Sequence, residues 1–95
     1  MFDIRTAEDG SIHFSGRFDA SQEPKARAFM AGLAAGRHVL DFSALDYISS
    51  AGLGVLLGTQ KRLMESGGAL RIVNATKHIR DIFFFSGLAR VFEIP

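Results

Sequence analysis

The sequence predicts a single α/β domain over residues 1–95, with a mixed β-sheet and helices packed mainly on one of its faces. Short apolar runs typical of buried strands alternate with segments whose apolar residues recur at helical spacing. The predicted order is β-β-α-β-α-β-α-β, and strands that alternate with helices imply parallel pairing. A length of 95 residues fits one domain and leaves no room for a second core.

Two antiparallel strands are predicted at the start of the chain, over Phe2–Thr6 and residues 11–15. Both segments alternate weakly between apolar and polar residues, and they flank Asp9-Gly10, a dipeptide that strongly favours a hairpin turn. Gly16 is expected to end the second strand or to form a bulge in it. This antiparallel hairpin is what makes the predicted sheet mixed.

The first helix is expected to have Ser21 as its capping residue. Pro24 then falls in the first turn, where its missing amide proton has no intrahelical partner. Gly36 is expected to end the helix. The predicted buried face consists of apolar residues at helical spacing: Ala26, Phe29, Met30 and Leu33.

The centre of the chain is predicted to run from a strand through a polar turn into a second helix. Residues 38–42 form the buried strand, residues 43–46 the turn, and Tyr47-Ile48 resume the extended chain. Ser50 precedes or begins a helix that starts at Ala51, and a serine there is suited to cap the helix N-terminus. The apolar stripe of this helix comprises Leu53, Leu56, Leu57, Gln60, Leu63 and Met64, and Ser66-Gly67-Gly68 ends it.

The last third of the chain predicts a strand at Ala69–Val73, a helix at Lys77–Phe85 capped by Thr76, and a final short strand at residues 91–94. The helix contains three consecutive phenylalanines. Ile79, Ile82 and Phe83 are expected to face the core, with Phe85 at its margin and Phe84 turned outward. An outward phenylalanine is a candidate interface residue.

Composition and charge exclude several functional classes. Eleven Lys and Arg residues balance ten Asp and Glu to a net charge of +1 and are scattered, which argues against nucleic-acid binding. Cysteine is absent, and the three histidines have no metal-ligand spacing, so neither a metal nor another cofactor is expected. No nucleophile-elbow motif occurs, which favours a protein that is not an enzyme. No signal peptide or membrane span is recognised, so we expect a cytoplasmic protein that does not bind membranes.

Three glycines at the start of the second helix invite comparison with phosphate-binding loops. Gly52, Gly54 and Gly58 match neither the dinucleotide nor the P-loop pattern. Gly52 is expected to let the loop enter the helix, and Gly54 and Gly58 to let the helix approach the sheet closely. The helix N-terminus at residues 49–52 still attracts anions, which leaves a nucleotide- or anion-sensing domain as an alternative.

Three motifs in order resemble the STAS domain family, the anti-sigma-factor antagonists, over nearly the whole chain. The central one combines Asp41-Phe42-Ser43 with the run Ile48-Ser49-Ser50-Ala51-Gly52-Leu53-Gly54-Val55-Leu56-Leu57. Gly16-Arg17-Phe18-Asp19 precedes it, and Ile82-Phe83-Phe84-Phe85-Ser86-Gly87-Leu88 follows it. The resemblance implies a STAS fold and a regulator of a bacterial partner-switching pathway that controls transcription.

The resemblance also implies a mechanism. In that family, one serine is phosphorylated by a partner serine kinase that is also the anti-sigma factor. The unphosphorylated protein captures this kinase, and phosphorylation blocks the capture. A PP2C-type phosphatase removes the phosphate and restores the capture. Ser50 matches the phosphorylated serine, and Ser49 is the second, less favoured hydroxyl. The acidic residues Asp19 and Asp41 match positions at strand ends around this site. The implied partner-binding residues are Asp19, Asp41, Ser49, Ser50, Ala51, Gly52, Leu53 and Gly54.

The chain departs from the family pattern at two positions. Ser49 stands where the family carries Asp, and the loss of this carboxylate favours an alternative, an interaction or scaffold module that is never phosphorylated. Phe84 falls where the family usually has a charged or polar residue. The chain also ends at Pro95, before the family's final helix. We therefore expect an uncovered apolar face, at which Phe84 or a second subunit of a homodimer would lie.

Overall fold

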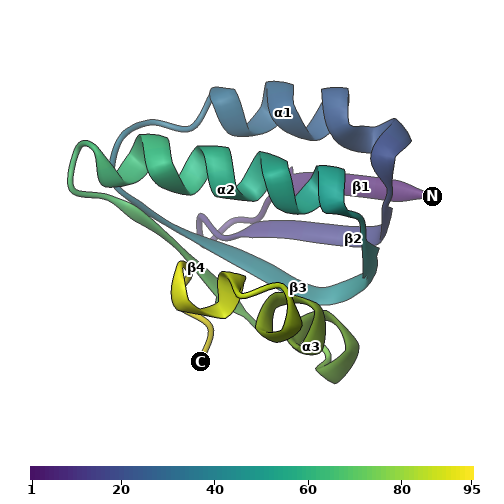
Figure 1. The fold of residues 1–95 in the computed structure, drawn as a ribbon. Helices are drawn as coiled ribbons and strands as arrows, with labels where there is room; N and C mark the ends of the chain where they lie inside the picture. The colour runs from purple at the N-terminus through teal and green to yellow at the C-terminus, as the bar shows by residue number, and fades with distance from the viewer.

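The computed structural model describes residues 1–95 as a four-stranded sheet with three α-helices (Figure 1). The strands are β1 (Phe2–Thr6), β2 (Ile12–Phe18), β3 (Arg37–Ile48) and β4 (Ala69–Val73). The helices are α1 (Glu23–Ala31), α2 (Ser50–Met64) and α3 (Lys77–Phe85), with short 3-10 helices η1 (Ala20–Gln22) and η2 (Leu88–Arg90). None of the helices combines the length and apolar character that crossing a bilayer demands.

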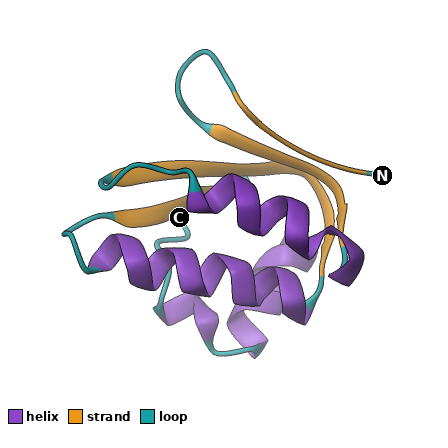
Figure 2. Cartoon of the chain, turned by 90° about the horizontal axis from the view of Figure 1, so that it is seen from above, coloured by secondary structure: helices purple, strands orange, loops and turns teal.

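The sheet has the order β1-β2-β3-β4. β1 pairs antiparallel with β2, whereas the β2–β3 and β3–β4 pairs are parallel. Seen from above in Figure 2, the helices lie on the same side of the sheet. The predicted α/β class, the mixed sheet and the one-sided arrangement of helices are therefore confirmed.

Gly16 does not end β2, and the bulge beside it lies in β3, where Leu45 and Tyr47, two residues apart, pair with the adjacent residues Gly16 and Arg17. The φ of Gly16, +82°, is one that glycine adopts without strain. The next amide, that of Arg17, donates a hydrogen bond to the Met1 carbonyl at 2.9 Å. β2 therefore continues to Phe18, three residues beyond the predicted end.

The turn predicted at residues 43–46 is wrong, because β3 is one uninterrupted strand of 12 residues. Ala44 and Leu45 pair with Ser15 and Gly16 of β2, and Leu45 is completely buried. Ser43 is exposed. The polar residues that suggested a turn thus belong to a strand whose apolar positions still reach the core, since pairing with β2 outweighs local turn preference.

The first helix begins and ends at residues other than those predicted. Asp19, not Ser21, provides the first cap, because its carboxylate accepts a hydrogen bond from the Ser21 amide and so starts η1. α1 follows directly and ends at Ala31, with Gly32 as its C-cap, before the predicted end at Gly36. Gly36 has a φ of +123° and leads into β3.

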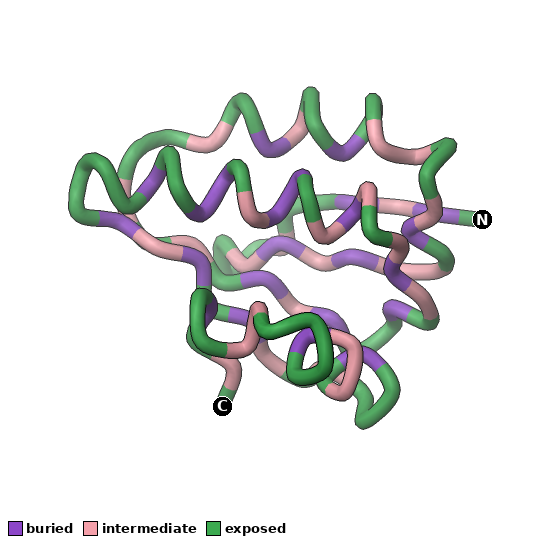
Figure 3. Tube along the Cα trace, in the orientation of Figure 1, coloured by how far each residue is buried: buried purple, intermediate pink, exposed green.

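Nineteen buried residues form one hydrophobic core between the sheet and the helices. In Figure 3, buried and exposed positions alternate along the helices. Six phenylalanine rings form a continuous chain through the core, with neighbouring centroids between 4.8 and 6.4 Å apart: Phe2, Phe18, Phe14, Phe42, Phe83 and Phe92. This row of aromatic rings connects β1 to the C-terminal segment.

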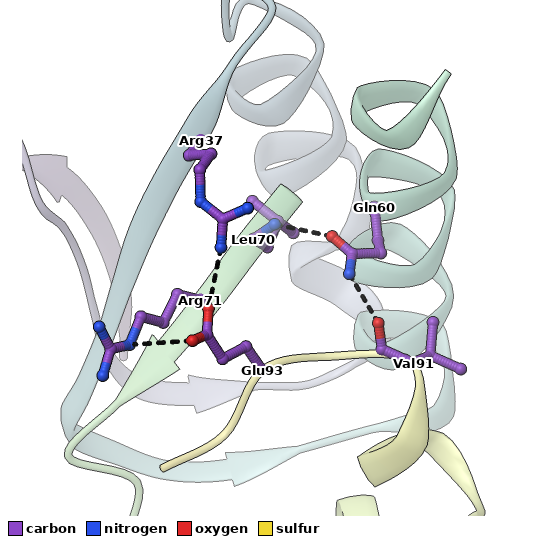
Figure 4. A network of polar contacts seen from close by, with 6 residues as sticks. All are labelled: Arg37, Gln60, Leu70, Arg71, Val91 and Glu93. Atoms are coloured by element: carbon purple, nitrogen blue, oxygen red, sulfur yellow. Dashed lines mark hydrogen bonds and ion pairs between the residues drawn. The ribbon is translucent and has the colours of Figure 1, made fainter. Parts of the chain in front are cut away.

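The strand predicted at residues 91–94 is wrong, since only a single parallel bridge joins Arg71 to Glu93. Side chains hold this segment instead (Figure 4). The buried Gln60 accepts a hydrogen bond from the Leu70 amide at 2.7 Å and donates one to the Val91 carbonyl at 2.6 Å. Glu93 forms ion pairs with Arg37 and Arg71 at 3.1 and 3.9 Å.

α3 has the predicted bounds and the predicted cap at Thr76, whose hydroxyl accepts a hydrogen bond from the Ile79 amide. Phe83 is completely buried, as expected. Phe84 is 69% exposed, which confirms that it points outward. The expectation for Phe85 is wrong, because it is 81% exposed and does not reach the margin of the core.

Candidate functional site

The candidate site is the turn of residues 49–54, where β3 passes into α2 (Figure 1). The last residue of β3, Ile48, pairs with Phe18 at the end of β2. The amide of Ser49 extends this ladder by donating a hydrogen bond to the Phe18 carbonyl at 2.9 Å. Because β2 and β3 are parallel, Asp19 follows Phe18 at the same edge of the sheet as the turn.

Ser49 is the cap of α2. Its backbone is extended, with φ −86° and ψ 169°, and its Oγ accepts a hydrogen bond from the Gly52 amide at 3.2 Å. This satisfies one of the amides that have no partner within the helix. The side chain is half-buried. The helix therefore starts one residue earlier than Ala51, and the capping serine is the first of the pair.

Ser50 is the first residue of α2 and is exposed. Its hydroxyl forms no hydrogen bond within the chain. The first amides of a helix lack intrahelical partners and carry partial positive charge, which stabilises a negative group placed beside them. Ser50 thus combines an accessible hydroxyl with surroundings that accommodate an anion.

Gly52 is buried where α2 contacts the ends of β2 and β3. A Cβ atom at this position would lie 2.9 Å from Cγ1 of Ile48 and 3.2 Å from the Phe18 ring. The close approach expected at Gly54 and Gly58 is wrong, because a Cβ on either would meet no atom within 4 Å. The glycine that brings the helix onto the sheet is Gly52, and Gly54 is exposed.

Asp19 lies beside the turn with its carboxylate ionised. The Ser21 hydroxyl donates to Oδ1 at 2.6 Å and the Ser21 amide at 3.1 Å. The hydroxyl contact is the main reason that the pKa of Asp19 is lowered, and the nearby charge of Arg17 acts in the same direction. The structure therefore brings a carboxylate to the edge of the sheet where the turn lies.

Asp41 lies inside β3, away from the turn. Its strand partner is His13, whereas Ile48 pairs with Phe18, and these partners are five residues, or roughly 16 Å, apart along β2. Its carboxylate accepts hydrogen bonds from the Ser43 amide at 2.9 Å and from Asn74 Nδ2 at 3.0 Å. Partial burial opposes ionisation, but these hydrogen bonds outweigh it and lower the pKa of Asp41.

A contact between Arg17 and Tyr47 escaped sequence analysis. The Arg17 guanidinium lies 4.4 Å from the centre of the Tyr47 ring, next to the final pair of the β2–β3 ladder. A cation over an aromatic face is attracted to it, by roughly 0.5–1 kcal/mol at an exposed site. The two residues become partners through the register shift beside Gly16, and the sequence did not indicate which residues this shift would pair.

The turn is an open surface. The molecule has three surface hollows, and residues 49–54 line none of them. No three histidine or carboxylate side chains come together in an arrangement that would hold a metal ion. An exposed hydroxyl beside a carboxylate on an open helix N-terminus is suited to contact another macromolecule.

Residues 2–93 match the family described as Mlab, STAS domain. The match covers almost the entire chain. The chain belongs to the STAS family. This STAS domain is 30% identical over 95 residues to the anti-sigma-B factor antagonist of Bacillus subtilis, an alignment that covers 97% of the chain and 87% of the relative.

A second relative is BtrV of Bordetella bronchiseptica, to which the STAS domain is 43% identical over 58 residues. This alignment covers 61% of the chain and half of BtrV. Among solved structures, the anti-sigma factor antagonist SpoIIAA in its unphosphorylated form has a TM-score of 0.76 at 22% identity, covering 100% of the chain and 88% of SpoIIAA. Its phosphorylated form has a TM-score of 0.71 at 22% identity, covering 100% and 91%. These structures share the fold of this STAS domain.

Proposed function

We propose that this STAS domain is an anti-sigma-factor antagonist that is switched by phosphorylation of Ser50. The turn of residues 49–54 docks on an anti-sigma factor that is also a serine kinase, and this capture releases a sigma factor. The name of the Bacillus subtilis relative supports the antagonist role. The observation that carries the proposal is that Ser50 has a free, exposed hydroxyl at the start of α2.

The geometry favours Ser50 over Ser49 as the acceptor. A kinase must bring the hydroxyl into line with the transferred phosphoryl group, which requires free access. Ser49 is half-buried, and its Oγ is engaged by the Gly52 amide. Presenting Ser49 would break the cap of α2 at a cost of about 1 kcal/mol. Ser50 can be presented without disturbing the helix.

Phosphorylation would act on the interface and leave the fold intact. A phosphate adds about −1.5 to −2 charges, which the N-terminus of α2 stabilises locally. Its bulk and charge would oppose docking, because the partner surface would have to desolvate and accommodate the group. The ionised Asp19 adds negative charge at the same edge of the sheet. Hydrolysis by a PP2C-type phosphatase would restore the docking surface.

This function requires binding but no catalysis by the chain itself, and it would be exercised in the cytoplasm, where sigma factors act. A homodimer is not needed for it. The competing function is an interaction module that is never phosphorylated. The observation in its favour is Ser49, a residue without the carboxylate that the family pattern has next to the acceptor.

Intact mass spectrometry tests the proposal. The protein is incubated with ATP and the partner serine kinase. We expect the wild type to gain one phosphate and the Ser50→Ala variant to gain none. Ser49→Asp is the matched control, because aspartate also caps helices, and it should still be phosphorylated. An unmodified wild type that nevertheless binds the kinase would establish the unphosphorylated module instead.

Nuclear magnetic resonance separates a third function, nucleotide sensing, from docking. Titration with ATP in the absence of kinase should leave the amide signals of residues 49–54 unchanged, because this surface has no cavity for a base. Saturable shifts confined to these amides would identify the turn as a nucleotide site.

A further inference from the structure

We propose that a second surface, formed by α3, η2 and the segment that follows η2, binds an acidic, amphipathic segment of another protein. We call it the α3–η2 surface and define it by Arg80, Phe84, Phe85, Ala89, Arg90 and Ile94. It lies on elements other than the turn of residues 49–54 and contains none of its residues. The inference therefore goes beyond the proposed function and does not depend on phosphorylation of Ser50.

The apolar part of this surface is a pair of adjacent aromatic rings. Phe84 is 69% and Phe85 81% exposed, and their ring centroids lie 5.6 Å apart at an interplanar angle of 80°. Burying a phenylalanine side chain is strongly favourable, so two exposed neighbours forgo a large stabilisation. The opposite side of α3 already supplies the core with Ile79 and Phe83. Phe84 and Phe85 are thus available to a partner.

Phe84 stands between two hollows that are large enough for side chains of a bound peptide. One has a volume of about 620 Å³ and is lined by Lys77, Arg80, Asp81, Phe84, Ala89 and Ile94. The other has a volume of about 350 Å³ and is lined by Phe84, Gly87, Ala89 and Arg90. Because Phe84 and Ala89 line both, a single extended or helical segment could place apolar residues on either side of the ring.

The rim of the two hollows carries excess positive charge. Arg80 and Arg90 line one hollow each and take part in no ion pair. The remaining charges at the rim, Lys77 and Asp81, neutralise each other at 2.7 Å. An apolar groove flanked by two unpaired arginines is complementary to a segment that carries Asp or Glu beside its apolar residues.

One wall of the groove is held in place before any partner binds. Ala89 and Ile94 belong to the segment that Gln60 fixes through the Val91 carbonyl (Figure 4). The backbone of Glu93 adds a second attachment, because its carbonyl accepts a hydrogen bond from the Ile72 amide at 2.8 Å. Because this wall is already ordered, less conformational entropy is lost when a partner binds.

The charges also argue against two other occupants. In a two-fold symmetric dimer each partner presents the same patch, so Arg80 and Arg90 would meet a surface with the same excess of positive charge, whose carboxylate, Asp81, is already paired with Lys77. An anionic membrane typically attracts clusters of about four to eight basic residues, whereas this surface has two unpaired ones and is concave. An acidic protein segment satisfies both the hollows and the arginines.

A phage-displayed library of random 12-residue peptides, panned against the immobilised wild-type protein, tests the proposal. We expect selected sequences to combine Asp or Glu with large apolar residues. A synthetic peptide of the selected sequence should shift the amide signals of α3 and η2 in a nuclear magnetic resonance titration. Its affinity, measured by fluorescence polarisation, should be unchanged by Ser50→Asp, since the surface is separate from the turn.

Matched variants identify the residues involved. Phe84→Ser and the double variant Arg80→Glu/Arg90→Glu should each lower the affinity for the peptide by about tenfold or more, the loss expected for an anchor at an interface. Met64→Ser and Arg5→Glu are the controls, because both side chains are exposed and lie outside the surface. All these positions are exposed, so the variants should melt as the wild type does.

Four results would overturn the proposal. The first is the absence of acidic residues from the selected peptides, and the second is a set of signal shifts confined to residues 49–54. The third is self-association in sedimentation that Phe84→Ser abolishes, which would make a second copy the occupant. The fourth is co-sedimentation with phosphatidylglycerol vesicles without peptide binding, which would make a membrane the occupant.

Discussion

The Oγ of Ser49 accepts a hydrogen bond from the amide of Gly52 at 3.2 Å, and this contact separates the roles of two adjacent serines. Ser49 stabilises the start of α2, whereas Ser50 keeps an exposed hydroxyl. The residue that departs from the family pattern thus retains a structural function. The two serines should therefore respond differently to substitution.

Replacing Ser49 should change stability according to whether the new side chain can cap a helix. Ser49→Ala removes the acceptor for the Gly52 amide and should lower the free energy of unfolding by about 1 kcal/mol. Ser49→Asp keeps an acceptor and adds a negative charge at the positive end of α2, so it should be as stable as the wild type or more so. Urea denaturation measures both, and equal losses would contradict the capping role.

Replacing Ser50 should affect binding more than folding. Ser50→Asp places a negative charge on an exposed residue at the start of α2. The melting temperature should stay close to that of the wild type, because the helix dipole favours this charge. Titration with the anti-sigma kinase should show much weaker capture. Strong destabilisation together with unchanged binding would contradict the proposed switch.

The two glycines near the start of α2 should respond in opposite directions to alanine. Gly52→Ala forces a Cβ to within 2.9 Å of Ile48 and should cost about 1–3 kcal/mol. Gly54→Ala meets no atom within 4 Å and improves helix propensity, which should raise stability by about 0.5–1 kcal/mol. Urea denaturation of the two alanine variants separates the effect of steric contact, present only at residue 52, from the effect of helix propensity. A similar effect at both positions would show that contact at Gly52 is unimportant.

Gln60 should be needed for the stability of the C-terminal segment. Gln60→Leu leaves the Leu70 amide and the Val91 carbonyl without their partner and should cost about 2 kcal/mol or more. Lys61→Leu, at the exposed neighbouring position, is the control and should change stability little. Hydrogen exchange should accelerate at the Val91 and Ile72 amides in the Gln60 variant alone. Unchanged exchange there would mean that other contacts suffice to hold the segment.

Acid should destabilise the protein partly through Asp19. Its pKa is lowered in the folded state by the hydrogen bond from the Ser21 hydroxyl. A lowered folded pKa contributes stability above the unfolded value near 3.8, and this contribution is lost as the pH falls through the folded pKa. Asp19→Asn should therefore lose less stability than the wild type between pH 5 and pH 2, a range chosen to span about two units around the unfolded pKa. Parallel acid profiles of the two proteins in urea would show that Asp19 does not contribute.

The sequence predicted correctly those elements that are stabilised by interactions between residues close together in the chain. The Asp9-Gly10 turn located β1, and the cap at Thr76 with the stripe of Ile79 and Phe83 located α3. The start of α2 was predicted to within one residue. The capping serine was predicted at Ser50, whereas the extended backbone of Ser49 and its contact with the Gly52 amide make Ser49 the cap.

Errors arose where distant segments decide the structure. Residues 43–46 have the composition of a turn, but the ladder with β2 keeps them extended. Residues 91–94 have the composition of a strand, but Gln60 and Glu93 hold them with only one bridge to β4. Asp41 was expected near the turn because of its place in a motif, and the length of β3 puts it elsewhere.

The contact between Arg17 and Tyr47 gives the protein an optical probe of its own. Tyr47 is the only tyrosine and the chain contains no tryptophan, so the intrinsic fluorescence above the phenylalanine background comes from a single ring. That ring lies under the Arg17 guanidinium, two residues before the cap of α2. A partner without tyrosine or tryptophan that displaces Arg17 would change the emission of this ring. Docking at the turn could then be followed in the unlabelled protein.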